Sequence, residues 1–250
     1  MKQMKIVLMA IIAIVMGTTF TSCLDSDDSP QVYIASGVVS DMYGTVMINS
    51  GDVRFVVNNS DDMTFSFSDS KETFYPTVAT IGYNQIEGKD YTEGKSSYDV
   101  YFVGYYNAYF GGNPMSLNES ESLTPIYGII ANSNGGNSVG AAFNYLLVEF
   151  TYHHGKEFEF SDFNMYPYKW ENNKLYVKFV HSAEVDHSST DNVSSLALCF
   201  QFPSKAVLEN KFPEIAFTGE DSNEITVVLT ADGPNDREIE TSSFKAQILY

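Results

Sequence analysis

The sequence predicts an all-β protein, and three observations lead to this prediction. From Val32 onward, the chain is a series of short apolar runs separated by Gly, Asn, Asp and Ser. The runs recur at about the 8–12-residue spacing that is typical of β-sandwiches and small barrels. Several of them alternate between apolar and polar residues, as half-buried strands do. Helical periodicity is nearly absent, so the expected helical content of the mature chain is one short helix at 204–210.

The first half of the chain, residues 32–131, is expected to form one β domain. Turn-forming residues at 49–52 and 58–62 separate its early strands, and a polar, glycine-bearing loop at 84–95 precedes its most aromatic run. In 63–67 the apolar residues occupy alternate positions, which predicts a strand with one buried face. The expected strands are 32–35, 45–48, 53–57, 63–67, 74–83 and 98–110, followed by a short apolar piece at 125–131.

The second half, residues 139–250, is expected to form a separate β domain. Residues 132–138 read Asn-Ser-Asn-Gly-Gly-Asn-Ser, a composition that favours a linker over a packed element. We therefore place the domain boundary there. The expected strands of the second domain are 144–152, 157–160, 174–180, 193–202, 224–230 and 238–249.

Residues 1–22 have the three parts of a secretory signal, namely a basic start, an apolar middle and small polar residues before the cleavage point. The apolar run is shorter than the roughly 20 residues of a spanning helix. Ser22-Cys23 has the form of a lipoprotein cleavage site, so Cys23 is the expected lipidation residue and 23–31 the lipidated tether. The alternative is an ordinary secreted protein with a chance cysteine. Lipidation predicts a membrane partner through Cys23 and a location in the cell envelope, as an outer-membrane lipoprotein.

The chain is strongly acidic, with a formal net charge of −18. Removal of the signal removes Lys2 and Lys5 and no acid, which leaves 14 − 2 = 12 basic against 32 acidic residues, or −20. Such a surface repels nucleic acid, so no nucleic-acid partner is expected. Cys199 is the second of two cysteines and lies in an apolar run, which indicates a buried position in a strand.

Three stretches carry a resemblance to a known family: 145–152, 175–181 and 195–204. In this order, behind a lipoprotein signal and an acidic tether, they resemble the NigD-like lipoproteins of Bacteroidetes. The resemblance implies an OB-like barrel in the first half and a β-sandwich in the second. The family name implies bacteriocin immunity. Asp25, Asp27 and Asp28 also resemble the export signal of surface lipoproteins, which implies display on the cell surface, with the periplasmic leaflet as the alternative.

The loop after 174–180 contains the densest group of metal-ligand residue types. His181, Glu184, Asp186 and His187 could bind zinc or another divalent ion, because imidazole and carboxylate are suitable ligands. Their spacing matches no named metal motif, and polar loops between strands usually have this composition, so we expect no metal site and keep these four residues only as weak candidates. No cofactor is expected.

The aromatic run 98–110 contains the best candidate binding surface. In a regular strand Tyr101, Tyr105 and Tyr109 share one face, and stacked tyrosines suit sugars or peptide side chains. The alternative is that this row packs in the core or between domains. Since no catalytic motif is present, we expect a non-enzymatic binding or accessory module with a protein or glycan ligand. An immunity-type protective lipoprotein and a glycan-active or metal-dependent enzyme remain the alternatives.

Overall fold

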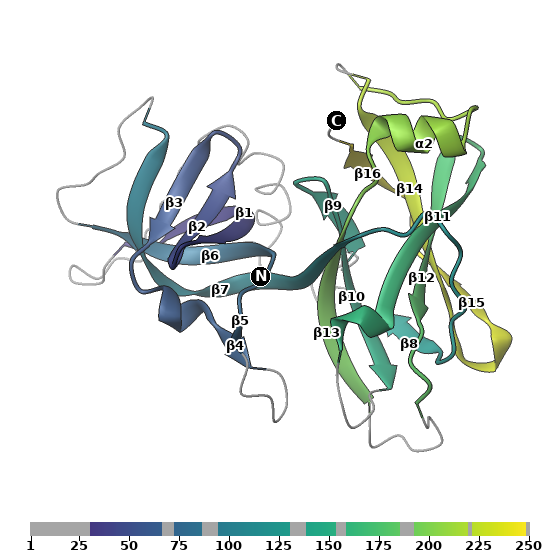
Figure 1. Cartoon of the computed structure of the whole chain (residues 1–250), viewed down its shortest axis with the longest axis horizontal. Helices are drawn as coiled ribbons and strands as arrows, with labels where there is room; N and C mark the ends of the chain where they lie inside the picture. The colour runs from purple at the N-terminus through teal and green to yellow at the C-terminus, as the bar shows by residue number, and fades with distance from the viewer. Residues whose placement is uncertain are drawn as a thin grey trace, which may run out of the picture. The chain divides into compact units, whose positions relative to one another are not determined.

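The computed structural model describes residues 31–66, 73–86, 95–130, 139–153, 159–185, 193–219 and 222–248. Strands dominate these residues, and the described residues contain one α-helix, α2 (Lys205–Lys211), close to its expected position. The all-β prediction is therefore confirmed. The chain divides into two compact units, residues 1–110 and 111–250 (Figure 1).

The first unit is a closed barrel of five strands: β1 (Tyr33–Met42), β2 (Thr45–Ser50), β3 (Val53–Val57), β6 (Val78–Gln85) and β7 (Ser97–Pro114). The strands β1, β2 and β3 form an antiparallel meander, and β6 lies between β1 and β7. Parallel pairing of β3 with β7 closes the sheet on itself. This pairing order is that of an OB-like barrel, so the expected architecture of the first half is confirmed.

The strand β1 bends in order to serve two neighbours. Its residues 33–38 pair with β6, and its residues 38–42 pair with β2. Gly37 lies at this change-over, where a Cβ would be 2.3 Å from the backbone oxygen of Asn49. Glycine is therefore required there because the backbone of β2 approaches too closely for any side chain.

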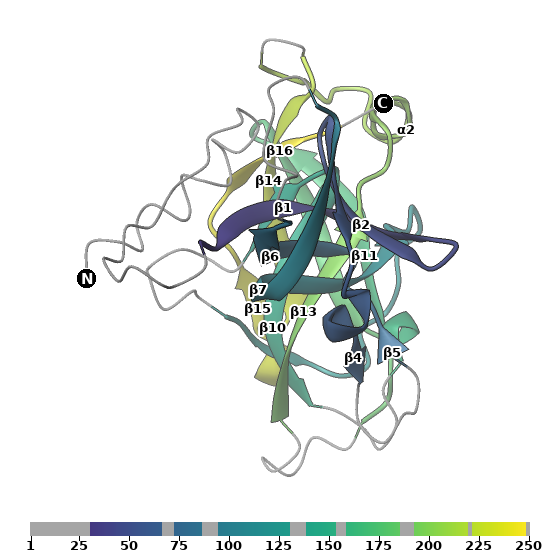
Figure 2. The same ribbon diagram turned by 90° about the vertical axis from the view of Figure 1, so that its left-hand side faces the viewer.

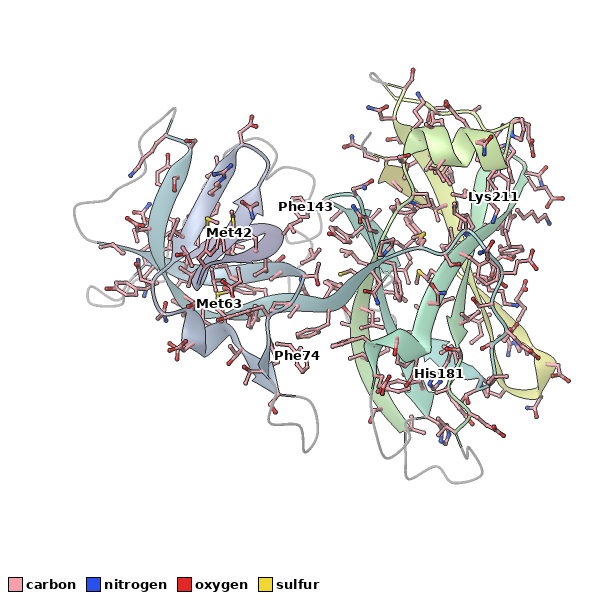
Figure 3. The ribbon with its side chains drawn as sticks, viewed as in Figure 1. Met42, Met63, Phe74, Phe143, His181 and Lys211 are labelled. Atoms are coloured by element: carbon pink, nitrogen blue, oxygen red, sulfur yellow. The ribbon has the colours of Figure 1, made fainter. Side chains whose placement is uncertain are left out.

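The segment between β3 and β6 differs from the expected strands. Met63 ends a 3-10 helix, η2 (Ser60–Met63), and the short strand β4 (Phe65–Ser66) pairs with β5 (Thr73–Phe74). Met63 is still fully buried in the barrel interior (Figure 3). Pro76 separates β5 from β6, where the sequence predicts one strand, because proline has no amide hydrogen for a ladder.

The second unit is a sandwich of two sheets, as the sequence predicts. The first sheet contains β8 (Ile126–Ile129), β9 (Val139–Ala142) and β13 (Val193–Gln201), all paired with β10 (Tyr145–His153). The second sheet contains β11 (Phe163–Glu171), β12 (Lys174–His181), β14 (Glu224–Asp232), β15 (Glu238–Glu240) and β16 (Phe244–Gln247). Two short 3-10 helices, η3 (Phe160–Asp162) and η5 (Pro234–Asp236), precede β11 and β15.

Aromatic rings from both sheets form the sandwich core. Phe150 on β10 is fully buried, and its ring centroid lies 4.5 Å from that of Phe179 on β12 and 5.1 Å from that of Phe163 on β11. Phe200 on β13 reaches Phe179 at 6.0 Å. Cys199 is buried in β13, as its apolar neighbours predict.

The two units divide after Phe110, earlier than the expected linker at 132–138, which lies outside the described residues. Beyond the division, Met115 N donates to Gln201 O, and β8 pairs with β10. Residues 111–130, expected in the first domain, therefore belong to the second unit. The physical reason is that the β3–β7 pairing already closes the barrel, so β8 finds its hydrogen-bond partners in the sandwich.

Two further strands differ from the expected ones. Phe160, expected at the end of a strand, begins η3, and residues 154–158 lie outside the description. The expected final strand, 238–249, is instead two short strands, β15 and β16, that pair with opposite ends of β14. Within the described residues, no helix is long and apolar enough to cross a membrane.

Candidate functional site

Exposed apolar side chains lie on the outside of the barrel strands β1 and β7, which pair with the two sides of β6 (Figure 2). Ile34 of β1 is 44% exposed, and Tyr101, Val103 and Tyr106 of β7 are 48%, 50% and 55% exposed. We call these four residues the aromatic face. Single apolar residues are normal on a protein surface, whereas a contiguous group of them often marks a binding site.

Two irregularities in β7 produce the aromatic face. The pairing of β6 with β7 shifts once between Thr80 and Ile81 and once between Gly82 and Tyr83. Each shift leaves one extra residue in β7, namely Tyr106 and Val103, as in a β-bulge. Phe102 and Tyr105 consequently pack against the barrel core, and Tyr101, Val103 and Tyr106 all face outward.

Two glycines lie opposite each other in the middle of this face. Gly82 of β6 pairs with Ile34 on one side and with Gly104 of β7 on the other. A Cβ at Gly82 would lie 3.3 Å from Cε2 of Tyr106, so the Tyr106 ring extends across this glycine. A Cβ at Gly104 would meet no atom within 4 Å, so the backbone there is open.

Neutral polar side chains flank the apolar residues. The hydroxyls of Ser36 and Thr80 lie 2.8 Å apart, and Asn107 is opposite Thr80. Asn84 is opposite Tyr101, and its buried Oδ1 has no hydrogen-bond partner among the residues that the structure describes. An unpaired buried acceptor costs about 1–3 kcal/mol, so Asn84 is poised to gain from a donor supplied by a ligand. Together these groups can bind a molecule that offers both apolar surface and hydrogen-bond donors.

The three tyrosines expected to share one face do not do so. Tyr105 points into the barrel, where its hydroxyl donates to Met63 O at 2.7 Å and its ring packs against Phe102 and Phe65. Burial, with a smaller contribution from Tyr75, raises the pKa of Tyr105. The two bulges between Tyr101 and Tyr109 break the period of two on which the expected row depends.

Tyr101 is exposed on the aromatic face, and Tyr109 is half-buried opposite Val78. Of the three tyrosines proposed from the sequence, Tyr101 thus belongs to the site. Tyr106, Val103 and Ile34 were not among the site residues proposed from the sequence. The available signal was Gly104, because an isolated glycine inside a strand pattern often marks a bulge.

The four candidate metal ligands are not brought together in the described part of the chain. His181 ends β12 and is 2% exposed, whereas Glu184 is exposed in the following loop. Asp186 and His187 lie outside the described residues, as does Cys23. Among the residues that the structure describes, no three His, Cys, Asp or Glu side chains converge to hold a metal ion.

His181 belongs instead to the aromatic core of the sandwich (Figure 3). Its ring stacks on Phe163 with the centroids 4.6 Å apart and meets Tyr152 edge-on at 5.6 Å. Its Nδ1 is buried and finds no hydrogen-bond partner within the described part of the chain. Burial lowers the pKa of His181 to about 4, so the imidazole is neutral at neutral pH.

We expect this histidine to make the sandwich sensitive to acid. With a pKa of about 4 when folded and 6.5 when unfolded, the unfolded chain binds more protons between these values. The stability that neutral His181 provides is complete above 6.5 and is lost as the pH falls towards 4. Between pH 7 and pH 5, urea denaturation should show a loss of about 2 kcal/mol from this group.

The matched control for this acid effect is His181→Phe, which keeps the stacked ring and removes the titrating group. The variant should lose less stability than the parent between pH 7 and pH 5, because the other groups that titrate are the same. An equal loss of stability in the variant and the parent would contradict the assignment of the acid effect to His181. So would an imidazole pKa above about 5.5, measured by NMR for the folded parent chain.

Comparison with known proteins gives structural neighbours only. No family model matches the sequence, and no curated protein matches it. A candidate lipoprotein from Bacteroides fragilis NCTC 9343 is 13% identical, with a TM-score of 0.48, and the match covers 88% of this chain and 99% of that one. An uncharacterized protein from Parabacteroides merdae ATCC 43184 is 8% identical, with a TM-score of 0.45 and coverages of 87% and 99%.

A NigD-like immunity protein from Bacteroides caccae ATCC 43185 is 11% identical, with a TM-score of 0.40 and coverages of 86% and 94%. The structural neighbours thus include a protein of the family that the sequence resembles. The OB-like barrel and the sandwich described above rest on the strand pairing of this chain itself.

Proposed function

We propose that this chain is a non-enzymatic binding module, anchored to the outer membrane through a lipid on Cys23 and displayed on the cell surface. Its ligand-binding surface is the aromatic face of the barrel. The observation that carries the proposal is the outward placement of Tyr101, Val103 and Tyr106 by two bulges beside Ile34. Bulges commonly re-aim side chains next to functional sites.

The anchoring part of the proposal is supported by the sequence of the first 28 residues. Ser22-Cys23 follows an apolar run, and Asp25, Asp27 and Asp28 follow the cysteine. Each buried methylene of an acyl chain contributes about 0.8 kcal/mol, so a lipid with several chains holds a folded domain at a membrane without a spanning helix. The acidic surface of the chain then keeps the displayed domains soluble.

We expect Cys23→Ala to move the protein from the membrane fraction to the soluble fraction, because the variant cannot be acylated. The measurement is cell fractionation followed by mass spectrometry of the N-terminal peptide. Cys199→Ala is the matched control, since it removes the other cysteine and should leave the protein in the membrane. Membrane retention of Cys23→Ala would contradict the anchor.

Labelling of intact cells with a membrane-impermeant reagent tests surface display. Surface display is contradicted if the protein is labelled only after the cells are permeabilised.

The binding part of the proposal predicts that the double variant Tyr101→Ser/Tyr106→Ser loses affinity by about tenfold or more, because two exposed rings each contribute roughly 0.5–1.5 kcal/mol to an aromatic contact. The purified full chain would be tested against neutral polysaccharides, acidic polysaccharides and β-casein as an extended protein. Tyr43→Ser is the matched control, because Tyr43 is fully exposed on the turn between β1 and β2. Equal binding by the double variant and the parent, or an equal loss in Tyr43→Ser, would reject the aromatic face as the binding surface.

A further inference from the structure

We propose that the ligand of the aromatic face is an uncharged carbohydrate chain. This inference rests on the proposed function and adds the chemical class of the ligand. It follows from three properties of the face: the size of its apolar area, the spacing of its rings along β7, and the chemistry of the polar groups between them.

The apolar area suits a narrow ligand. From their exposed fractions, the four side chains together expose on the order of 400 Å², given roughly 150–250 Å² for a whole aromatic side chain. A stable protein interface needs about 800 Å² on each partner. The face therefore provides about half of the area that a folded protein partner would cover, and a ligand one chain wide matches it better.

The spacing of the rings suits an extended chain. In the pairing with β6, Tyr101 is opposite Asn84, and Tyr106 lies between the positions opposite Ile81 and Thr80. These positions are three to four residues apart on β6, so the two rings attach about 12 Å apart along the sheet at the usual rise per residue. A few sugar rings in a chain extend over such a length. An extended peptide that binds by strand addition needs a free strand edge, whereas β6, the central strand of this face, is paired with β1 on one side and with β7 on the other.

The polar groups of the face are amides and hydroxyls. Asn84, Asn107, Thr80 and the buried Ser36 are neutral, and the open backbone of Gly104 lies between Asn84 and Asn107 along the sheet. The charged side chain closest along β7 is Asp99, two residues before Tyr101, and the whole chain carries a net charge of −18. Acidic polymers are therefore repelled. Sugar hydroxyls can donate to amide and hydroxyl oxygens while the C–H faces of the rings stack on tyrosine.

The unpaired Oδ1 of Asn84 adds a specific site for a hydroxyl donor. Asn84 lies opposite the exposed Tyr101. Rotation of the Asn84 side chain on ligand contact would therefore bring Oδ1 to a sugar hydroxyl. Binding would then satisfy an acceptor that the unliganded chain leaves without a partner. This arrangement predicts that Asn84 contributes to affinity and costs stability.

The test is affinity electrophoresis of the full chain in native gels that contain one polymer each: starch, a mixed-linkage β-glucan, xylan, galactomannan, alginate, polygalacturonate, or β-casein. We expect retardation by at least one of the four neutral polysaccharides and by neither acidic one. Asn84→Leu should weaken this retention by about two- to tenfold, as the loss of one hydrogen bond predicts, while its thermal unfolding midpoint stays equal or rises. A role of Asn84 in folding alone would lower the midpoint and leave the retention unchanged.

A second variant tests the location without removing any contact. Gly104→Leu places a side chain in open space on the face, so it should block binding without unfolding the barrel. Gly128→Leu is its matched control, because a Cβ at Gly128 of β8 also meets open space. Binding of a neutral polysaccharide that is equal in Gly104→Leu and the parent would overturn the proposed site.

The outcomes separate the ligand class from the function. Retardation by β-casein or by an acidic polymer, abolished by Gly104→Leu, would overturn the carbohydrate inference and leave the aromatic face as a binding surface. No retardation by any of the four neutral polysaccharides would overturn the inference as well. If neither the neutral polysaccharides nor the other probes retard the chain, the proposed function is rejected together with the carbohydrate inference.

Discussion

Gly37→Ala should lower the free energy of unfolding of the barrel by about 3 kcal/mol, at the upper end of the usual cost of overpacking. The new Cβ would lie 2.3 Å from Asn49 O, 2.7 Å from Asn49 C and 2.9 Å from Cγ2 of Ile48. Two of these atoms belong to the backbone of β2, so no side-chain rotation relieves the contact. The β1–β2 pairing would have to open at the point where β1 changes partner.

Urea denaturation followed by circular dichroism measures this loss. The matched control is Gly104→Ala, on the same barrel, where a Cβ meets open space. That variant should be neutral or slightly more stable, because alanine restricts the unfolded chain more than glycine does. If Gly37→Ala were within about 0.5 kcal/mol of the parent, like an ordinary surface substitution, the close approach of β1 to β2 would be refuted.

Phe150→Ala should destabilise the sandwich by about 3–5 kcal/mol, the cost of removing a buried phenylalanine and leaving a cavity. Phe150 is fully buried, and its ring touches the rings of Phe179, Phe163 and Tyr152 at centroid distances of 4.5, 5.1 and 5.4 Å. It therefore joins β10 of one sheet to β11 and β12 of the other. Its loss removes apolar contacts on both sides of the core at once.

The fluorescence of Trp170, the single tryptophan of the chain, reports this change because it lies on β11 of the same unit. Thr151→Ala is the matched control, since Thr151 adjoins Phe150 on β10 and its hydroxyl makes only an exposed contact with Ser195. The control should stay within about 0.5 kcal/mol of the parent. Similar unfolding midpoints for Phe150→Ala and Thr151→Ala would show that Phe150 does not connect the two sheets.

The strands of the sandwich were the easiest part to predict. In β10 the buried residues Leu146, Val148 and Phe150 alternate with less buried ones, and the sequence shows that alternation directly. Cys199 follows the same logic in β13. A short helix was predicted between Pro203 and Pro213, and α2 lies there. Each of these features depends on residues close together in sequence.

The candidate site was only partly predictable. Tyr101 was identified, but Tyr105 was assigned to the same row because a strand was assumed to be regular. His181 was placed in a polar loop, as a weak candidate ligand, because polar residues follow it, although its ring stacks on Phe163 of another strand. The domain boundary was sought in an Asn- and Gly-rich segment, whereas the units divide at Phe110. In each case the deciding partner is distant in the chain.

The sequence by itself determined that the chain is built from strands and where most of these strands lie, and it predicts a lipoprotein signal before them. These properties follow from local alternation, turn residues and composition, which any short window of the chain contains. The tertiary structure alone decided which side chains face outward on β7. A bulge arises from the register between two strands, and β6 supplies half of that register. The aromatic face therefore exists only once β1, β6 and β7 have paired in the closed barrel.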